Sequence, residues 1–568
     1  MTNIINTVNM KFRLPLLFLL CLLTIPMYSQ QTGNGAPRLI VGVVVDQMRF
    51  DYLYKYQDHY GSDGFKRLMR EGYNFKNTHY SYIPTYTAPG HASIYTGATP
   101  EIHGIVGNSW FDRQSGNVVS NVGDPNVQTT GSVVENPNSY SPNRLLASTI
   151  SDQLRMGTNF KSKVISVSLK DRGAILPGGR TANAAYWYDW ESSPGHFVSS
   201  TYYMEQLPSW VQKFNAQEQA DKYLNETWTP LLPMSQYDES APDDNPHETI
   251  LRGKDSPTFP YKFGEMRKLY EGSTNFYQVL WGTPFGNTLV KDFALEALRN
   301  EELGKDAYPD MLCVSFSAPD VVGHTFGPQS VEVQDTYLRL DQDIADLLSA
   351  LDQEVGAGNY LLFLTSDHGA QPVVSWLHAN KMQAGLAVLP QFKQDLTFKL
   401  GQRFGAFDWI TYFGSEQIYL DRKLIAEKKI PLAEMQQAVA EIMETQPGVR
   451  YAVTAQDLQT ENYTEGQLAK LQRGFHPDRS GDVLLVYEPG IYPTSDFRTP
   501  VSKIRGTSHG SGYSYDTQVP LLWFGKGIKR GDSSRKVHPR DIAPTLSFML
   551  NLQMPSGASG TPLSELLD

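Results

Sequence analysis

Five apolar, β-branched runs are spaced along the chain, and most of them end next to an acid or a histidine. Apolar runs that lack polar–apolar alternation are typical of strands buried on both faces of a parallel sheet. Such strands predict an α/β protein with a buried central sheet. The runs are Leu39–Val45, Val164–Leu169, Met311–Ser317, Tyr360–Thr365 and Val519–Phe524.

Helical patterns alternate with these runs. Residues Thr336–Asp352 place apolar side chains three and four residues apart, which gives one apolar stripe along a helix. Asn287–Leu298 and Asp541–Leu550 show similar patterns. Alternating strands and helices predict a mostly parallel sheet sandwiched between helices, in three α/β/α layers.

Two long stretches interrupt this alternation. Residues 180–285 are rich in Tyr, Trp and Pro, and we expect them to form an inserted cap region. Residues 375–505 contain a helical pattern among short strand patterns, and we expect an inserted α+β subdomain. Both leave the predicted core just after candidate site residues, where inserted loops can cover a pocket. We expect residues 31–568 to form one domain that carries both insertions.

The first 30 residues have the pattern of a secretory signal peptide. Lys11 and Arg13 precede a mostly apolar stretch, residues 14–25, which is too short for a comfortable transmembrane span. Cys21 follows Leu20 rather than the small residue that a lipoprotein signal requires. We therefore predict an exported protein without a lipid anchor or stable membrane insertion.

The cysteine count bears on disulfides, and the charge distribution bears on the kind of partner. Without the signal peptide only Cys313 remains, so no intrachain disulfide is possible and a buried, inert thiol is expected. The 49 basic and 60 acidic residues give a net charge of −11 without long runs of one sign. This distribution argues against a nucleic-acid partner. An anionic substrate must then be attracted by local positive charge, such as metal ions.

Acids and histidines near the predicted strand ends are candidate metal ligands. In open parallel sheets, sites form outside the carboxyl ends of the strands. Asp320 and His324 are spaced i, i+4 and face the same point, and His509 could complete a three-ligand site. Each residue alone could equally cap a helix or lie in a loop. Together the six candidate ligands predict two metal ions about 4 Å apart. The ligands are Asp46, Asp320, His324, Asp367, His368 and His509.

The stretch Thr85–His91 supplies a candidate nucleophile, Thr87. Thr is a favoured N-cap, Pro89 suits the first helical turn, and Gly90 permits close backbone approach. A metal ion would stabilise the alkoxide, and a helix N-terminus would favour an anion. A plain helix cap remains the alternative interpretation of Thr87.

Taken together, these motifs resemble the alkaline phosphatase superfamily, in order, spacing and residue identity, from about residue 38 to the C-terminus. The resemblance is closest to the periplasmic alkaline phosphatases of flavobacteria that use a Thr nucleophile, the PafA type. It rests on the following residues: Asp46, Thr87-Ala88-Pro89-Gly90-His91, Asn108, Asp320, His324, Asp367-His368-Gly369 and His509-Gly510.

This resemblance implies a monomeric periplasmic enzyme that hydrolyses small phosphate monoesters. It also implies a phosphothreonine intermediate that is hydrolysed by water activated at zinc. The two implied zinc ions have separate ligand sets. One is held by Asp320, His324 and His509, and the other by Asp46, Thr87, Asp367 and His368.

Three further residues bear on the substrate. Asn108, Lys170 and Arg172 resemble the monoesterase arrangement of the family, whereas the related phosphodiesterases lack the Lys–Arg pair. A monoester dianion leaves its non-bridging oxygens free for cationic and amide donors, and a diester carries less charge. The alternative for Lys170 and Arg172 is a solvated turn that pairs with Asp171.

Two other functions remain open from the sequence. One is a phosphodiesterase or nucleotide pyrophosphatase on the same scaffold. The other is an exported protein that binds phosphate or sugar phosphates without turnover. An aryl phosphate and its methyl diester separate the first from a monoesterase, and a turnover assay separates the second.

Overall fold

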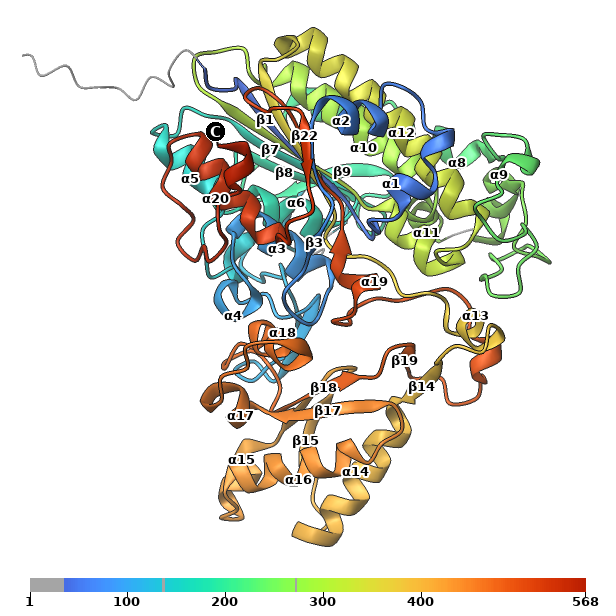
Figure 1. Ribbon diagram of the computed structural model, residues 1–568, viewed down its shortest axis with the longest axis vertical. Coiled ribbons are helices and arrows are strands. Elements are labelled where there is room, and N and C mark those ends of the chain that lie inside the picture. The colour runs from blue at the N-terminus through green and yellow to red at the C-terminus, as the bar shows by residue number, and fades with distance from the viewer. Residues whose placement is uncertain (1–34, 135–137, 271–272, 568) are drawn as a thin grey trace, which may run out of the picture.

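The computed structural model describes residues 35–134, 138–270 and 273–567, so the expected signal peptide lies outside the described residues. A ten-stranded mixed sheet forms the centre, in the order β22-β2-β21-β13-β1-β12-β7-β8-β9-β6 (Figure 1). Its middle strands run parallel and confirm four predicted strands to within one residue at each end. They are β1 (Leu39–Val45), β7 (Val164–Ser168), β12 (Asp310–Phe316) and β13 (Tyr360–Thr365).

Strand β21 (Leu521–Gly525) runs antiparallel to β13, with Leu521 opposite Thr365. The fifth predicted run, residues 519–524, is divided between β21 and the short strand β20 (Gln518–Val519). Because β21 is reversed, its first residue lies at the carboxyl end of β13. The loop that precedes β20 and β21 is thereby directed to the same sheet edge as the carboxyl ends of the parallel strands.

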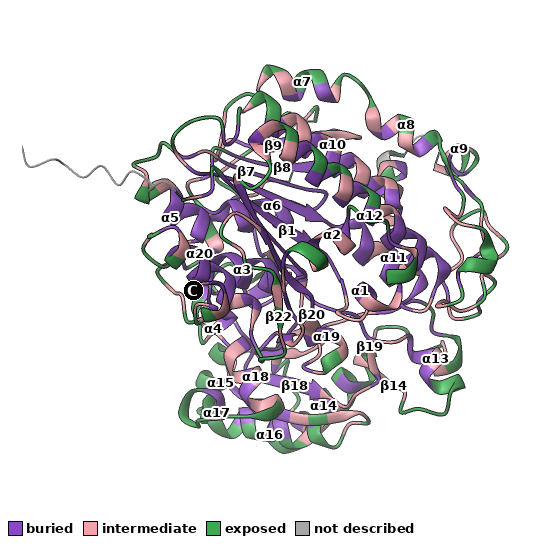
Figure 2. Ribbon diagram, turned by 45° about the horizontal axis from the view of Figure 1, so that its top comes forward, coloured by how far each residue is buried: buried purple, intermediate pink, exposed green. Residues whose placement is uncertain are grey.

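Helices cover both faces of the sheet, as predicted, and the sheet between them is buried (Figure 2). Val41 and Val43 of β1 pack in one core with α10 (Pro284–Asn300) and α12 (Val331–Leu351). The alternate β1 residues, with Ile40 among them, pack in a second core on the other face. Its helices are α3 (Thr87–Thr96), α5 (Ile150–Gly157) and α20 (Ile542–Met549).

The expected insertion over residues 180–285 is narrower than predicted. Strands β8 (Ala184–Asp189) and β9 (His196–Ser200) belong to the central sheet, where β8 pairs parallel with β7. The aromatic run is a strand because Tyr186 and Tyr188 are buried in the core beside α10. Beyond β9, short helices and a two-stranded sheet continue to Gly282: α7 (Ser209–Asn215), α8 (Gln219–Asn225), β10 (Thr227–Trp228), β11 (Tyr261–Lys262) and α9 (Phe263–Met266).

Residues 385–487 contain a separate four-stranded sheet, in the order β15-β16-β18-β17, at the foot of Figure 1. Helices α14 (Leu389–Phe404) and α16 (Leu432–Glu444) pack on it in a core of its own. We call this unit, together with α18 (Gly466–Gly474), the subdomain. Its strands are β15 (Ile410–Phe413), β16 (Gln417–Leu420), β17 (Val449–Thr454) and β18 (Val483–Tyr487).

Two expectations from the sequence concern single features. Cys313 lies in β12 as a free, buried cysteine, as predicted. Among the helices of the described residues, none has both the length and the apolar character needed to cross a bilayer.

Candidate active site

The predicted metal ligands converge at one edge of the central sheet. Asp46 directly follows β1, and Ser366 alone separates β13 from Asp367 and His368. Asp320 and His324 lie on α11 (Ala318–Phe326), which begins just after β12. The loop before β20 and β21 brings a further ligand, His509, to the same place. The side chains are buried except for that of His324, which is 37% exposed at the rim.

Their donor atoms form two groups, each with all atoms within 4.8 Å of one another. One group is Asp46, Asp367 and His368, as the resemblance implies. The other is Asp320, His368 and His509, in which His368 replaces the expected His324. His324 Nε2 lies 3.2 Å from Asp320 Oδ1. The six residues thus form one continuous cluster, with His368 between the two sets.

Hydrogen bonds fix the orientation of the three histidines. The Nδ1 of His324 donates to the carbonyl of Thr507 at 2.8 Å, and the Nδ1 of His509 donates to that of Thr85 at 2.8 Å. His368 Nδ1 donates to its neighbour's carbonyl at 2.9 Å. Because a carbonyl can only accept, Nδ1 carries the hydrogen in each ring, and Nε2 of the neutral imidazole then has a lone pair. Metal-binding histidines are commonly held in this way.

Buried atoms without partners mark where a cation fits. Asp46 Oδ1, Asp367 Oδ2 and His368 Nε2 are buried and have no hydrogen-bond partner. His368 Nε2 lies 3.4 Å from Asp46 Oδ1 and 3.7 Å from Asp367 Oδ2. Electron pairs that face one another in a buried site are unfavourable unless a cation lies between them. Imidazole nitrogen with carboxylate oxygen is a donor set that suits zinc.

The electrostatics agree with this interpretation. Burial, together with the carboxylates of Asp320 and Asp367, holds the pKa of Asp46 well above its usual range. Lys170 lies between the two sets, with its Nζ 2.6 Å from Asp46 Oδ2 and 2.6 Å from Asp320 Oδ2. Burial alone lowers the pKa of Lys170, but the two carboxylates outweigh it and raise that pKa. The cluster therefore favours positive charge.

Thr87 is the first residue of α3, and Tyr86 occupies the N-cap position. The alternative interpretation, in which Thr87 caps the helix, is therefore wrong. The side chain of Tyr86 makes no capping hydrogen bond. Asn108 performs part of that task from outside, because its Oδ1 accepts from Ala88 N at 2.9 Å. The hydroxyl of Thr87 lies at a buried helix N-terminus, where an anion is favoured.

Close packing joins the start of α3 to the metal-ligand cluster. A Cβ on Gly90 would lie 2.4 Å from the carbonyl oxygen of Asp367. His91, fully buried, bonds through Nδ1 to the carbonyl of Thr87 at 2.9 Å and lies 3.4 Å from Asp367 Oδ2. Its Nε2 contacts Ser315 Oγ at 2.9 Å. His91 therefore positions the first turn of α3 against β12 and the cluster.

Gln47 is a residue of the site that the sequence reasoning missed. Its Nε2 donates to Asp320 Oδ1 at 2.6 Å, and its backbone N–H donates to Asp367 Oδ1 at 3.1 Å. Its φ of 63° is in the left-handed region, which is uncommon for a residue other than glycine and clusters at functional sites. The available signal was its place immediately after Asp46 at the end of β1.

Lys170 and Arg172 lie at the start of α6 (Asp171–Gly178), where Lys170 is the N-cap residue. The alternative of a solvated turn does not describe Lys170, which is buried and bonded into the cluster. Arg172 Nη1 lies 3.7 Å from Asp171 Oδ1, and its Nε has no hydrogen-bond partner. The guanidinium of Arg172 is therefore only loosely paired with Asp171.

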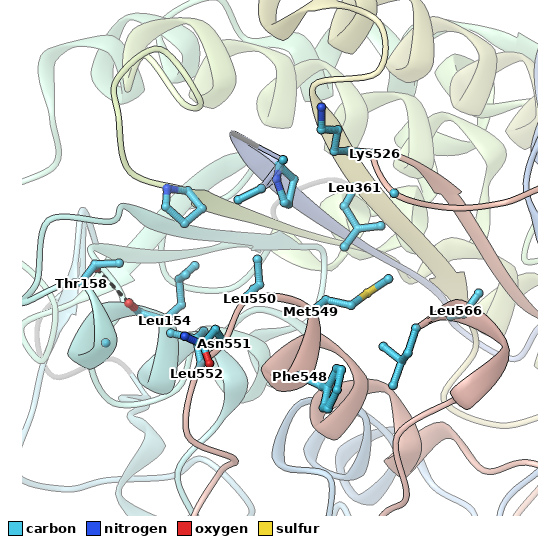
Figure 3. A pocket seen from close by; sticks show the side chains of 17 residues that line it. Leu154, Thr158, Leu361, Lys526, Phe548, Met549, Leu550, Asn551, Leu552 and Leu566 are labelled. Atoms are coloured by element: carbon cyan, nitrogen blue, oxygen red, sulfur yellow. Dashed lines mark hydrogen bonds between the residues drawn. The ribbon is translucent and has the colours of Figure 1, made fainter. Parts of the chain in front are cut away.

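Another cavity, of about 500 Å³, lies at the opposite end of the sheet, against the start of the described chain (Figure 3). Its walls are mainly apolar and carry no acid or histidine among the described residues. The side chains that define it include Leu154, Leu361, Phe548, Met549 and Leu550. It lacks the acids and histidines that a metal centre requires, so the metal-ligand cluster remains the candidate active site.

The substitution Gly90→Ala tests the packing between α3 and the cluster. We expect it to destabilise the protein by about 1–3 kcal/mol, because the added Cβ meets backbone atoms that cannot move away. Turnover should fall as well, since the Asp367 backbone is displaced. Urea unfolding monitored by circular dichroism measures the first effect.

Gly401→Ala in α14 is the matched control, because its Cβ would lie 3.8 Å from the nearest atom, in Ala406. We expect this change to be neutral or to stabilise by up to about 1 kcal/mol through helix propensity. Equal free energies of unfolding in the two variants would contradict the packing that we describe for α3.

Residues 40–512 match the family model described as type I phosphodiesterase / nucleotide pyrophosphatase. This match spans most of the chain, so the chain belongs to that family. The fold and the cluster at the sheet edge define the class more closely, as the alkaline phosphatase superfamily. The resemblance stated from the motifs is thereby confirmed.

Two curated relatives and two solved structures specify the branch. Alkaline phosphatase PafA of Elizabethkingia meningoseptica is 42% identical over 543 residues, covering 95% of this chain and 97% of PafA. Alkaline phosphatase PhoV of Synechococcus elongatus is 44% identical over 531 residues, covering 94% and 93%. The crystal structure of wild-type PafA gives a TM-score of 0.88 at 41% identity, covering 94% of this chain and 99% of that chain. A PafA variant changed at one Thr, one Asn, one Lys and one Arg gives 0.86, again at 41% identity, covering 93% of this chain and 99% of that chain. This chain is therefore an alkaline phosphatase of the PafA type.

Proposed function

We propose that this alkaline phosphatase hydrolyses phosphate monoesters at a two-zinc centre, by two successive in-line displacements with Thr87 as nucleophile. The observation that carries the proposal is the buried cluster of unpartnered carboxylate and imidazole atoms packed against the start of α3. When bound, two zinc ions would stabilise the attacking and leaving oxygens and activate water.

In the first displacement, Thr87 Oγ1 forms a bond to phosphorus while the bond to the ester oxygen breaks. The alcohol leaves and phosphothreonine remains. In the second, water attacks that phosphorus, phosphate is released and the Thr87 hydroxyl is restored. The N-terminus of α3 favours the negative charge at each stage. His91 holds the carbonyl of Thr87 and so positions the nucleophile.

The ligand sets that we propose follow the family. Asp320, His324 and His509 hold one zinc ion, and Asp46, Asp367 and His368 hold the other beside Thr87. Bringing His324 fully into the first set requires only that it move in from the rim, since its Nε2 is already 3.2 Å from Asp320 Oδ1. The lone pairs left on Nε2 by the carbonyl contacts supply the nitrogen ligands.

Asn108, Lys170 and Arg172 are proposed to bind the non-bridging oxygens of the phosphoryl group, where charge concentrates in phosphoryl transfer. Asn108 keeps an amide donor because only its Oδ1 bonds to α3. The loosely paired Arg172 guanidinium has N–H groups to offer. The four residue types changed in the PafA variant have the same separations along the chain as Thr87, Asn108, Lys170 and Arg172.

Chelation tests the metal centre. We expect elemental analysis to give two zinc ions per chain, and removal of zinc to abolish turnover of an aryl phosphate. The free energy of unfolding should fall by about 4 kcal/mol or more, because tightly bound metal stabilises only the folded state. Adding zinc back should restore both quantities. Full turnover by the metal-free protein would contradict the proposal.

A phosphodiesterase or nucleotide pyrophosphatase is the second candidate, and the description of the matching family model favours it. The buried Lys170 beside the cluster argues for a more highly charged substrate. Turnover of an aryl phosphate and of its methyl diester, compared in one preparation, decides between them.

We further propose that the protein is exported to the periplasm as a monomer. The basic start and short apolar stretch of the first 30 residues support cleavage and export. Mass spectrometry of the periplasmic fraction should find a mature N-terminus near residue 30. Light scattering gives the oligomeric state. Recovery of the uncleaved chain in the cytoplasm would contradict export.

A further inference from the structure

A basic cavity lies outside the active site, where the subdomain meets the C-terminal part of the chain. Its volume is about 500 Å³, within the range of small-molecule sites. Lys470 and Arg473 line it from α18, and Lys536 and Arg540 line it from the segment between β22 (Gly531–Ser533) and α20. We call it the basic cavity.

The four cations of the basic cavity have no carboxylate partner in a salt bridge within the described part of the chain. Arg540 Nε is buried and has no hydrogen-bond partner. Neighbouring cations behave differently: Lys76 pairs with Asp532 at 2.7 Å, and Arg535 pairs with Glu565 at 2.6 Å. The positive charge of the cavity is thus left for a ligand.

The cations also act on one another. Burial lowers the pKa of Lys470, and Lys536 and Arg473 lower it further. Burial and Arg473 likewise lower the pKa of Arg540, although nearby acids oppose them. The acids around the cavity are Glu465 in its wall and Asp541 and Glu101 near Arg540. Four like charges in so small a volume repel one another, and a bound anion would relieve that repulsion.

The cavity also adjoins two loops of the active site. Lys470 Nζ donates to the carbonyl of Gly512, three residues after His509. The carbonyl of Lys470 accepts from Ile83 N at 3.1 Å, four residues before Thr87. Arg473 contacts the carbonyl of Ser81 at 3.3 Å. The helix that carries two of the cavity's cations is therefore bonded directly to the segments that carry the nucleophile and a metal ligand.

We propose that the basic cavity binds a small polyanion carrying two or more phosphate- or sulfate-type groups, at a site separate from the active site. The cations lie on two separate segments, and several anionic groups on one molecule can contact α18 and the C-terminal segment together. Charge-assisted hydrogen bonds to lysine and arginine are the contacts expected for these groups.

Naphthalene-1,3,6-trisulfonate is the probe, because it has three fixed anionic groups, no ester bond to hydrolyse and little affinity for zinc. It is titrated into the zinc-loaded enzyme by following its fluorescence, with enough orthovanadate present to abolish turnover and so block the active site. We expect one molecule to bind per chain. Naphthalene-1-sulfonate, with a single charge, should bind at least about tenfold more weakly.

The double variant Lys536→Gln/Arg540→Gln should weaken trisulfonate binding at least about tenfold. Lys529→Gln/Arg530→Gln removes the same charge from the exposed segment between β21 and β22, outside the cavity, and should leave binding unchanged. The single change of the exposed Lys536 serves if the double variant unfolds. Absence of binding to the blocked wild-type enzyme, or equal affinities in the two double variants, would overturn the proposal.

Discussion

Replacing Thr87 with Ala should lower turnover of an aryl phosphate by at least about 10³-fold, because the change removes the only group proposed to attack phosphorus. Zinc content and thermal stability should remain close to those of the wild type. The first turn of α3 does not depend on the hydroxyl for capping, since Tyr86 is the N-cap residue and Asn108 bonds to Ala88. The measurement is kcat with saturating substrate and full zinc occupancy.

Thr87→Ser is the matched control, because it keeps the hydroxyl and removes only a methyl group. We expect it to retain most of the turnover. If Thr87→Ala turned over nearly as fast as Thr87→Ser, water would be the attacking group and the role assigned to Thr87 would be wrong.

Replacing both Lys170 and Arg172 with Ala should reduce kcat/KM for a monoester at least about 10²-fold more than for its methyl diester. The reason is charge: a monoester dianion presents more negative charge to the two cations than a diester does. The same preparation is assayed with an aryl phosphate and with its methyl diester, so that losses common to both substrates cancel in the ratio.

Lys170 also bridges the carboxylates of Asp46 and Asp320, and its removal could disturb the metal sites themselves. Zinc analysis of the variant separates the two effects, and Arg172→Ala alone provides a variant that leaves that bridge in place. Equal losses on monoester and diester, with both zinc ions present, would contradict a substrate-selecting role for the pair.

The strands of the core could be predicted because burial on both faces forces each of them to be apolar throughout. Residues 39–45 and 360–365 were located to the residue for this reason. Strand β8 was missed because Tyr186 and Tyr188 fill the same buried positions with aromatic rings, which resemble a cap region in the sequence. Composition alone does not separate a buried aromatic strand from a packed insertion.

The direction of the strands could not be predicted from the sequence either. Nothing in residues 519–524 shows that β21 runs antiparallel to β13, yet this reversal is what brings the preceding loop and His509 to the carboxyl edge. Direction depends on how the chain crosses over the sheet, which involves the whole subdomain rather than a local pattern.

Some features of the site could be predicted from the sequence and others could not. The convergence of the acids and histidines could be predicted, because strand ends meet at one edge. The contacts of Gln47 with Asp320 and Asp367 could not, since they require a left-handed backbone at a residue that is not glycine. The position of His368 between both donor groups likewise depends on the path of the loop after β13.

The central claim is that a phosphoryl group is transferred to Thr87 at a two-metal centre, and trapping that intermediate tests it most directly. The zinc-loaded enzyme is mixed with an aryl phosphate, quenched in acid within the first turnover, digested and analysed by mass spectrometry. We predict one phosphoryl group on the peptide containing Thr87, and none after quenching Thr87→Ala. A phosphoryl group on another residue, or release of phosphate without any phosphorylated peptide in the first turnover, would contradict the account.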